Sequence, residues 1–296
     1  MHKRRDCPKI ILTMNGEVLH DVGIDGLMLP RPEIYQPSLA SAAADGFYRP
    51  KGGPTPRCGP DGGFVFTGLK AWPARGTFLD EGLAIGIASL MASDNSTSLL
   101  DVGAGSGQYG AFYHARRASG LPAPMWSGVD GARGVAEYTR RFGPPGAQTA
   151  HVNLCDASAA ARVGVHDWAV SLAVGEHVPS RCLSAFLHVL HVSNRHGVIL
   201  SWDEVKGSGD GCHVSAKLQR QLVAAFDFLG GYQFDREATI LLRGNSTISW
   251  LKRNLLVLRR NASHEAREPP SIEDQAFRDW HTNRAAARSA RKRRYE

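Results

Sequence analysis

The sequence of 296 residues contains no apolar run of about 18 or more residues, the length that a membrane-spanning helix needs. Its first residues, Met1–Asp6, are basic like the start of a secretory signal, but the apolar stretch behind them covers only Ile10–Leu12. We therefore expect a cytoplasmic protein that neither spans nor binds a membrane.

Cysteine is scarce, and its distribution excludes the usual cysteine-based sites. The five cysteines are odd in number and scattered, and no Cys-x-x-Cys pair occurs. Neither a disulfide framework nor a zinc site is indicated, so we expect reduced thiols. The five residues are Cys7, Cys58, Cys155, Cys182 and Cys212.

Excess charge is absent from most of the chain. The segment Arg284–Glu296 holds six basic residues and one acid, and so carries +5 of the net charge of +7. The remainder is nearly neutral, which argues against a body that binds nucleic acid. Three interpretations of the basic tail stay open: a solvated chain end, a nuclear localisation signal, or a contact to RNA.

The chain opens with a hairpin pattern, in which Ile10–Met14 and Glu17–His20 flank the turn dipeptide Asn15–Gly16. The sequence after it is rich in glycine and proline and predicts loops. We expect three parts: an N-terminal hairpin and Gly/Pro-rich extension at 1–75, a central domain at 76–260, and a polar linker with the basic tail at 261–296.

The central part alternates between apolar strand patterns and helical patterns. A helix is predicted at Phe78–Met91, where Gly82 and Gly86 permit close packing, and four more helical stretches separate the later strands. This order predicts an α/β fold with a doubly wound, mostly parallel sheet. The last strand, Leu255–Leu258, lacks a good crossover helix before it, so we expect it to be antiparallel. The strands before it are predicted at 98–102, 125–129, 150–153, 167–172 and 197–202, and the helices between them at 111–119, 132–142, 181–192 and 216–228.

The most informative segment is Leu99–Gly110, where a strand runs into a glycine-rich turn and then a helix. Glycines let a backbone turn tightly and approach a ligand, and open sheets bind ligands at the carboxyl ends of their strands. Two patterns overlap here. Gly105–Gly110 fits the dinucleotide pattern Gly-x-Gly-x-x-Gly, with Asp130 placed 20 residues further on. Asp101–Gly107 also reads Asp-x-Gly-x-Gly-x-Gly.

The acid-first pattern resembles motif I of class I S-adenosylmethionine (SAM)-dependent methyltransferases. The anion of Asp101 suits the cationic methionine end of SAM and would be a poor neighbour for a pyrophosphate. Asp156 follows the third strand, where this family accepts a hydrogen bond from the adenine amino group. No tyrosine is followed four places later by lysine, as a dehydrogenase would favour. An NAD(P)-dependent oxidoreductase using Gly105–Gly110 and a catalytically inactive SAM-fold protein remain the alternatives.

The resemblance implies a Rossmann-like seven-stranded sheet with SAM as cofactor. Asp130 ends its strand, so its carboxylate can accept from both ribose hydroxyls. The competing interpretation of both Asp130 and Asp156 is a helix N-cap. The expected cofactor contacts are Asp101, Gly103, Ala104, Gly105, Gly107, Asp130, Gly131, Asp156, Ala157 and Leu172.

The segment Asp167–Pro179 resembles motif IV and the residues after it in the type-11-like methyltransferase group. In that group a Glu-His pair, here Glu176 and His177, faces the methyl group and can orient an acceptor or take its proton. Ala173 stands where many relatives carry an acid, so we expect no metal site. The competing interpretation of the pair is helix capping and packing.

A later segment adds a third candidate. The strand end Leu200–Trp202, a glycine-rich loop at Gly207–Gly211 and the pair His213–Val214 resemble a little-characterised eukaryotic branch found in algae and nematodes. The resemblance implies methyl transfer to an unidentified acceptor, and we expect a small molecule rather than a macromolecule. If the acceptor loses a proton, His177 or His213 is the candidate base, and the competing interpretation of His213 is a loop hydrogen bond.

Overall fold

The chain divides into two compact units, Met1–Ser41 and Ala42–Glu296, which are described separately. In the first unit β1 (Thr13–Met14) pairs antiparallel with β2 (Glu17–Val18) around Asn15–Gly16, which confirms the hairpin in a shorter form. The basic tail, the Gly207–Gly211 loop, Cys7, Cys58 and Cys212 lie outside the described residues. The computed structural model describes residues 13–14, 17–18, 65–66, 72–74, 77–205 and 213–261.

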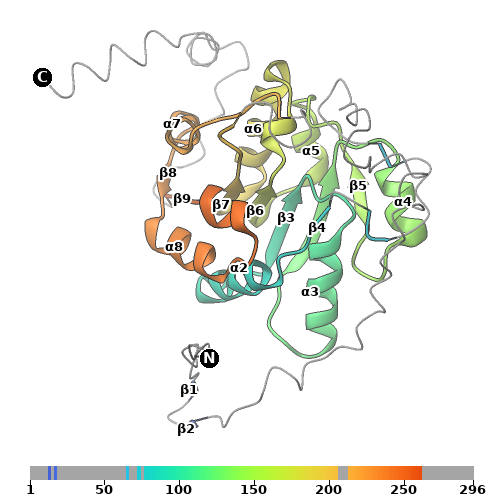
Figure 1. Ribbon diagram of the computed structural model, residues 1–296, viewed down its shortest axis with the longest axis vertical. Coiled ribbons are helices and arrows are strands. Elements are labelled where there is room, and N and C mark those ends of the chain that lie inside the picture. The colour runs from blue at the N-terminus through green and yellow to red at the C-terminus, as the bar shows by residue number, and fades with distance from the viewer. Residues whose placement is uncertain are drawn as a thin grey trace, which may run out of the picture. The chain divides into compact units, whose positions relative to one another are not determined.

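The second unit is built on one seven-stranded sheet with the order β5-β4-β3-β6-β7-β9-β8 (Figure 1). The strands β3 to β7 run parallel, and β9 pairs antiparallel with both β7 and β8. The predicted fold and the antiparallel last strand are confirmed, whereas β8 was not predicted. The strands are β3 (Ser98–Val102), β4 (Met125–Asp130), β5 (Thr149–His151), β6 (His166–Leu172), β7 (Asn194–Ser201), β8 (Tyr232–Phe234) and β9 (Leu255–Arg260).

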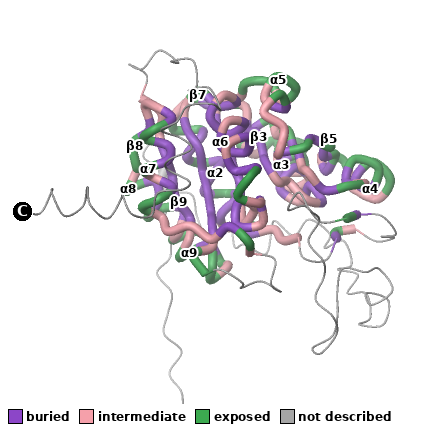
Figure 2. The backbone as a smooth tube through the Cα atoms, turned by 90° about the horizontal axis from the view of Figure 1, so that it is seen from above, coloured by how far each residue is buried: buried purple, intermediate pink, exposed green. Residues whose placement is uncertain are grey.

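Helices cover both faces of the sheet because successive strand residues point to opposite sides. Leu99 belongs to a core cluster that contains residues of α2, α3, α8 and α9, while its neighbour Leu100 belongs to a second cluster with residues of α5, α6 and α7. Figure 2 shows the buried chain running through the sheet and α2, with exposed chain along α4 and α5. The helices are α2 (Glu81–Ser93), α3 (Gln108–Ala118), α4 (Val135–Phe142), α5 (Ala159–Val163), α6 (Leu183–Val192), α7 (Gln219–Leu229), α8 (Arg236–Asn245) and α9 (Ser249–Asn254), with short 3-10 helices η2 (Gly175–His177) and η3 (Ser180–Cys182).

Asp80 fixes the start of α2 and also its contact with the segment Ser246–Ile248, which lies far away in the sequence. Its carboxylate accepts from the backbone N–H of Leu83 at 3.0 Å, which caps the helix. Its other oxygen accepts from the hydroxyl of Ser246 at 2.6 Å and from the N–H groups of Thr247 and Ile248. Asp80 is fully buried, so these bonds hold α2 against the connection between α8 and α9.

The small residues of α2 allow the close packing that was predicted. A Cβ atom at Gly82 would lie 2.1 Å from the carbonyl oxygen of Asn245, and one at Gly86 would lie 2.6 Å from its side chain. Because these distances are shorter than real contacts permit, α2 and α8 approach each other only where glycine is present.

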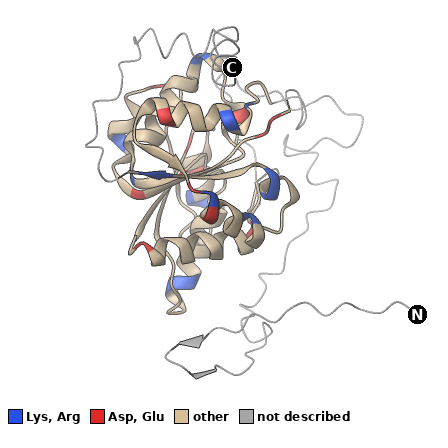
Figure 3. Cartoon of the chain, turned by 90° about the vertical axis from the view of Figure 1, so that its left-hand side faces the viewer, with Lys and Arg blue, Asp and Glu red and all other residues tan. Residues whose placement is uncertain are grey.

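Charged residues of both signs are interspersed on the described chain in the view of Figure 3. Arg259 on β9 forms ion pairs with two carboxylates, Asp94 at 2.7 Å and Asp235 at 2.9 Å. Asp94 follows α2 and Asp235 caps the start of α8, so these ion pairs link β9 to the end of α2 and to the start of α8. Among the described helices, none has both the length and the apolarity to cross a bilayer.

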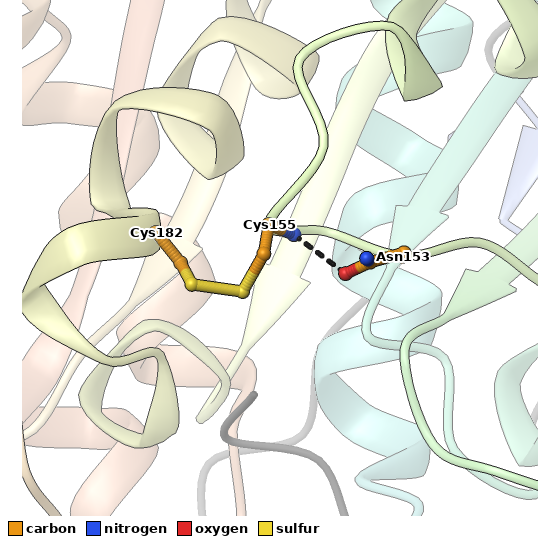
Figure 4. The surroundings of a disulfide bond; sticks show 3 residues. All are labelled: Asn153, Cys155 and Cys182. Atoms are coloured by element: carbon orange, nitrogen blue, oxygen red, sulfur yellow. Dashed lines mark hydrogen bonds between the residues drawn. A yellow bond between two sulfur atoms is a disulfide. The ribbon is translucent and has the colours of Figure 1, made fainter. Parts of the chain in front are cut away.

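Two cysteines are joined, contrary to the expectation of reduced thiols. Cys155, in the loop after β5, forms a disulfide with Cys182 at the start of α6, with the Cα atoms 4.4 Å apart (Figure 4). The N–H of Cys155 also donates to the side-chain oxygen of Asn153 at 3.0 Å. The prediction was wrong for this pair because the residues are 27 apart with no motif, and only the folding of the sheet brings them together.

Candidate cofactor and acceptor site

The candidate residues gather where the parallel strands end. Within the sheet, β4 and β6 are the two neighbours of β3. The chain passes from β3 to β4 and β5 in one direction, and then returns to place β6 on the opposite side of β3. The order of strands therefore reverses between β3 and β6, and such a point is where open α/β sheets bind ligands. The glycine-rich turn follows β3, and the Glu-His pair follows β6.

Three glycines shape the turn, since Gly103, Gly105 and Gly107 all have positive φ angles, of 89°, 55° and 75°. A side chain at Gly103 would lie 2.2 Å from Val174, and one at Gly107 would lie 2.0 Å from a backbone carbonyl oxygen, that of Ala147. The turn therefore needs glycine for conformation and for space. The contact with Val174 also brings the end of β6 against the turn.

Asp130, at the end of β4, binds the backbone of the turn. Its Oδ2 atom accepts from the N–H of Gly105 at 2.8 Å, and its Oδ1 atom accepts from the N–H of Ala132 at 2.7 Å. Burial raises the pKa of Asp130, and these two bonds oppose that rise. The helix α4 begins only at Val135 after Gly134, so the interpretation of Asp130 as its N-cap is wrong.

Asp101 lies in β3 directly beneath the turn and is buried. Its carboxylate accepts a hydrogen bond from the indole N–H of Trp126 on β4 at 3.1 Å. Burial raises the pKa of Asp101 to about 7, the hydrogen bond from Trp126 opposes this rise, and the charge of Asp130 adds to it. A cation bound nearby would favour the ionised form of Asp101 and lower this pKa.

Asp156 has a local role in the structure. It accepts from the N–H of Ser158 at 2.9 Å and from its hydroxyl at 2.7 Å, and it pairs with Arg162 at 3.2 Å. The bonds from Ser158 are the main cause of its lowered pKa. Ser158 is the N-cap residue of α5, so Asp156 shapes the turn before this helix and does not cap it. Its side chain is 42% exposed, which leaves room for a ligand group.

The other expected cofactor residues lie at the same edge of the sheet. Ala104 donates its N–H to the carbonyl oxygen of Val129 at 3.0 Å, which ties the turn to β4. Gly131 follows Asp130 directly, and Leu172 ends β6. Each of these residues, and also Ala157 after β5, is half-buried.

Two residues before α2 contact the turn and were not predicted. The indole N–H of Trp72 donates to the carbonyl oxygen of Ser106 at 2.7 Å, and Thr77 shares a hydrogen bond with the Ser106 hydroxyl at 2.7 Å. Ser106 is thereby fully buried. No sequence signal marked Trp72, because it stands among glycines and prolines without a periodic pattern.

The acceptor side begins where β6 ends. Ala173 has a positive φ of 54°, and its N–H donates to the hydroxyl of Ser201 at the end of β7, at 2.8 Å. This turn places Glu176 inside the protein, 2% exposed. Burial raises the pKa of Glu176 to about 7, although the backbone N–H groups of Glu176 itself and Asp203 donate to its carboxylate. Its Oε2 atom has no hydrogen-bond partner among the described residues.

The segment that carries His213 is attached to the Glu-His pair. The N–H of Ser215 donates to the carbonyl oxygen of Glu176 at 2.9 Å, and the indole N–H of Trp202 donates to the carbonyl oxygen of Ser215 at 2.7 Å. His213 Nδ1 forms a hydrogen bond with Asp203 Oδ2 at 2.9 Å. Asp203, which lies two residues after the end of β7, was not among the predicted site residues.

The three predicted acceptor-side residues form one cluster. The rings of His177 and His213 are 4.7 Å apart at 86°, an edge-to-face contact. One nitrogen of each ring and one carboxylate oxygen of Glu176 all lie within 4.8 Å of one another. Glu176 and His177 belong to η2, which has no side-chain cap, so the capping interpretation of this pair is wrong. For His213 the loop hydrogen bond exists, and it is made to Asp203.

Comparison with known proteins gives fold-level similarity at low identity. No protein-family model matches the chain, and no curated protein matches it. Among solved structures, magnesium protoporphyrin IX methyltransferase from Synechocystis PCC 6803 with bound SAM is similar at 15% identity and a TM-score of 0.41, over 60% of this chain and 78% of that one. The methyltransferase domain of the bacterial protein CtHen1 has 16% identity and a TM-score of 0.40, over 61% and 98%. The plantazolicin methyltransferase BpumL, in complex with SAH, has 14% and 0.42, over 61% and 82%.

Proposed function

We propose that the chain is a SAM-dependent methyltransferase of class I that transfers a methyl group to an O, N, S or C atom of a small-molecule acceptor. Within that class the type-11-like eukaryotic branch remains our assignment from the sequence. The observation that carries the proposal is the bond between Asp130 and the N–H of Gly105. A carboxylate already occupies the N–H group that a dinucleotide phosphate would need.

The start of α3 is closed to a diphosphate for a second reason. Dinucleotide sites place the pyrophosphate at the N-terminus of the helix that follows the glycine turn. Here the backbone at Ala147 packs against Gly107, the N-cap residue of α3, and Trp72 and Thr77 cover Ser106 just before it. The contacts at this helix end therefore disfavour a dinucleotide and the oxidoreductase alternative.

The charges beside the turn suit a cationic ligand. Burial is the main cause of the raised pKa of Asp101, and the negative charge of Asp130 adds to it, so an anion near Asp101 already disfavours its ionised form. The sulfonium and ammonium groups of SAM would relieve this repulsion, whereas two phosphates would increase it. This argument supports SAM through charge alone and is independent of the glycine pattern.

The candidate residues would have two roles: one group would bind SAM and the other would bind the acceptor. SAM, when bound, supplies an activated methyl group on a positively charged sulfur. Asp130 would hold the ribose hydroxyls, Asp156 the adenine amino group, and Asp101 would balance the positive charge of the methionine end. The cluster of Glu176, His177 and His213 would face the acceptor and orient it. Because the methyl group of SAM is already activated, the main task of such a site is to align the two reactants, an effect worth up to about 7–11 kcal/mol.

Calorimetry with the purified full chain tests the cofactor. We expect SAH to bind with a measurable enthalpy and NAD to give none. Asp130→Ala should weaken SAH binding at least about 10- to 100-fold, because hydrogen bonds to a charged group are lost. Glu137→Ala is the matched control, since Glu137 is an exposed acid on α4. Binding of NAD, or equal SAH binding by both variants, would refute the assignment.

A second experiment tests catalysis and the nature of the acceptor. The chain is incubated with SAM labelled in the methyl group and a cell extract, and the products are separated by size. Label in the small-molecule fraction is the expected result. Label only in protein or nucleic acid would overturn the acceptor class. SAH binding without any transfer would favour the catalytically inactive SAM-fold protein.

A further inference from the structure

We propose that Glu176, His177 and His213 bind one divalent first-row transition-metal ion, with Asp203 holding His213 in position. The three side chains offer one carboxylate oxygen and two imidazole nitrogens within 4.8 Å of one another. Two histidines and one carboxylate form a ligand set that suits zinc or iron(II) and leaves coordination positions open. This proposal concerns binding of the ion and does not depend on methyl transfer.

The buried carboxylate is the first supporting observation. Glu176 is 2% exposed, and its Oε2 atom lacks a hydrogen-bond partner in the described part of the chain. A buried polar atom without a partner costs about 1–3 kcal/mol, so such atoms usually meet a ligand, an ion or water. The position of Glu176 beside two imidazoles makes a cation the ligand that fits its remaining oxygen.

The bond between His213 and Asp203 is the second, independent observation. Asp203 Oδ2 lies 2.9 Å from His213 Nδ1, and the His213 side chain is only 13% exposed. A carboxylate that accepts from Nδ1 favours the tautomer with its proton on that nitrogen, and in this tautomer Nε2 carries the lone pair with which an imidazole binds a metal ion. Metal-binding histidines commonly have such a carboxylate on the other nitrogen, where it orients the ring and raises its basicity.

The backbone supports this arrangement from two strands. Glu176 and His177 share η2 after β6, and the bond from Ser215 N–H to the Glu176 carbonyl joins them to the segment that begins at His213. Glu176 and His177 follow β6, and Asp203, which binds His213, follows β7, so the cluster lies where two neighbouring parallel strands end. Ligand atoms around a tetrahedral ion with bonds of about 2.0–2.1 Å are roughly 3.3 Å apart, so the cluster would contract around the ion.

The alanine at position 173 does not exclude this metal site, contrary to our expectation from the sequence. The lack of an acid there led us to expect no metal. Three protein ligands are, however, the number found in catalytic zinc sites, where the fourth position stays open for water or substrate. An ion at this place could bind an acceptor hydroxyl or amine and lower its pKa.

The test measures metal binding by the full chain without SAM. Metal is removed with a chelator, and Zn²⁺, Co²⁺ and Mg²⁺ are each titrated by calorimetry, with the visible absorption of Co²⁺ as a second readout of its ligands. We expect about one Zn²⁺ per chain and a Co²⁺ spectrum typical of four or five ligands. Mg²⁺ should bind far more weakly, because it prefers oxygen ligands. Tighter binding of Mg²⁺ than of Zn²⁺ would overturn the proposed class of metal.

Variants assign the site to its ligands. Glu176→Gln and His213→Gln should each lower Zn²⁺ affinity about 100-fold or more, and Asp203→Asn should lower it about 10- to 100-fold. His114→Gln is the control, since His114 is exposed on α3 outside the cluster. A second control, Cys212→Ser, tests the thiol next to His213 in the sequence. Equal affinity in the wild type and in Glu176→Gln, or loss of binding in Cys212→Ser alone, would overturn the proposal.

Circular dichroism and SAH calorimetry on the same variants separate the two proposals. We expect Glu176→Gln to stay folded and to bind SAH as the wild type does, while Zn²⁺ binding is lost. If Glu176→Gln does not fold, Asp203→Asn keeps the test decisive, because its expected loss applies to Zn²⁺ affinity and to the Co²⁺ spectrum. Absence of Zn²⁺ binding in a wild-type protein that binds SAH would refute the metal site and leave the methyltransferase assignment intact.

Discussion

The indole N–H of Trp126 donates to the carboxylate of Asp101 across the neighbouring strands β4 and β3, at 3.1 Å. It is the hydrogen bond that opposes the effect of burial on Asp101, whose pKa nevertheless rises to about 7. Asp101 therefore changes charge near neutrality, directly beneath the turn proposed to hold SAM. Its ionisation should therefore affect both the binding of SAM and the stability of the fold.

The affinity for SAM should rise with pH. Ionisation of Asp101 supplies the anion that favours a cationic ligand, so we expect about a 3- to 10-fold gain between about pH 5.5 and pH 7.2, below the range in which an α-amino group titrates. Asp101→Asn should bind SAM more weakly and lose most of this pH dependence. Calorimetry at a series of pH values measures both proteins. An identical pH profile in wild type and Asp101→Asn would show that another group is responsible.

The unliganded protein should respond to pH in the opposite sense. The folded-state pKa of Asp101 lies above its ordinary value, so its contribution to stability is complete below about pH 4 and is lost as the pH rises through about 7. Asp101→Asn removes this loss. We expect the variant to gain about 1–3 kcal/mol relative to wild type between pH 5 and pH 8. Urea denaturation at several pH values measures the difference, and a constant difference would contradict the prediction.

Asp80→Ala should destabilise the protein by about 2–4 kcal/mol, because it removes a helix cap and leaves buried donors without an acceptor. Burial alone would raise the pKa of Asp80, but its hydrogen bonds, first that from Ser246, outweigh this effect and lower it. The contribution of the ionised form is therefore lost only in acid, as the pH falls through the lowered pKa. Glu81→Ala, an exposed neighbour in the same helix, should change the free energy of unfolding by no more than about 0.5 kcal/mol in urea.

The disulfide between Cys155 and Cys182 should be detectable as a linked peptide in a non-reducing digest analysed by mass spectrometry. The residues are 27 apart, and closing a loop of that length in the unfolded chain corresponds to about 2–4 kcal/mol of stability. A reductant should lower the thermal midpoint of the wild type and leave a Cys155→Ser/Cys182→Ser variant unchanged. Two free thiols at these positions in the oxidised protein would contradict the bond.

Much of the fold could be predicted from local patterns. The apolar segments that became β3, β4, β6, β7 and β9 are long enough to be recognised alone. The strand β8 spans only Tyr232–Phe234, and only Tyr232 is buried while the last two residues are exposed, so no apolar pattern marks it. The helices α8 and α9 between β8 and β9 were also missed. Their described apolar residues include the exposed Ile240, Leu241 and Trp250, which blurs the helical period.

The candidate site was predictable in its parts but not in its assembly. Asp130 and the glycines could be named because the turn chemistry is local: glycine at positive φ and an acid at a strand end each leave a mark in the sequence. The sequence also predicted the pair Glu176 and His177 and, in a separate segment, His213. That they lie within 4.8 Å of one another depends on the pairing of β6 with β7, which no local pattern encodes.

The order of residues by itself therefore determined the alternation of strands and helices, the need for glycine after β3, and the acids placed at strand ends, because each depends on neighbours along the chain. The tertiary structure alone decided which distant groups meet: Cys155 with Cys182, Trp72 with Ser106, and Asp203 with His213. The physical reason is that hydrogen bonds, disulfides and metal-binding clusters depend on distance in space, and the sheet sets that distance only after its strands have paired.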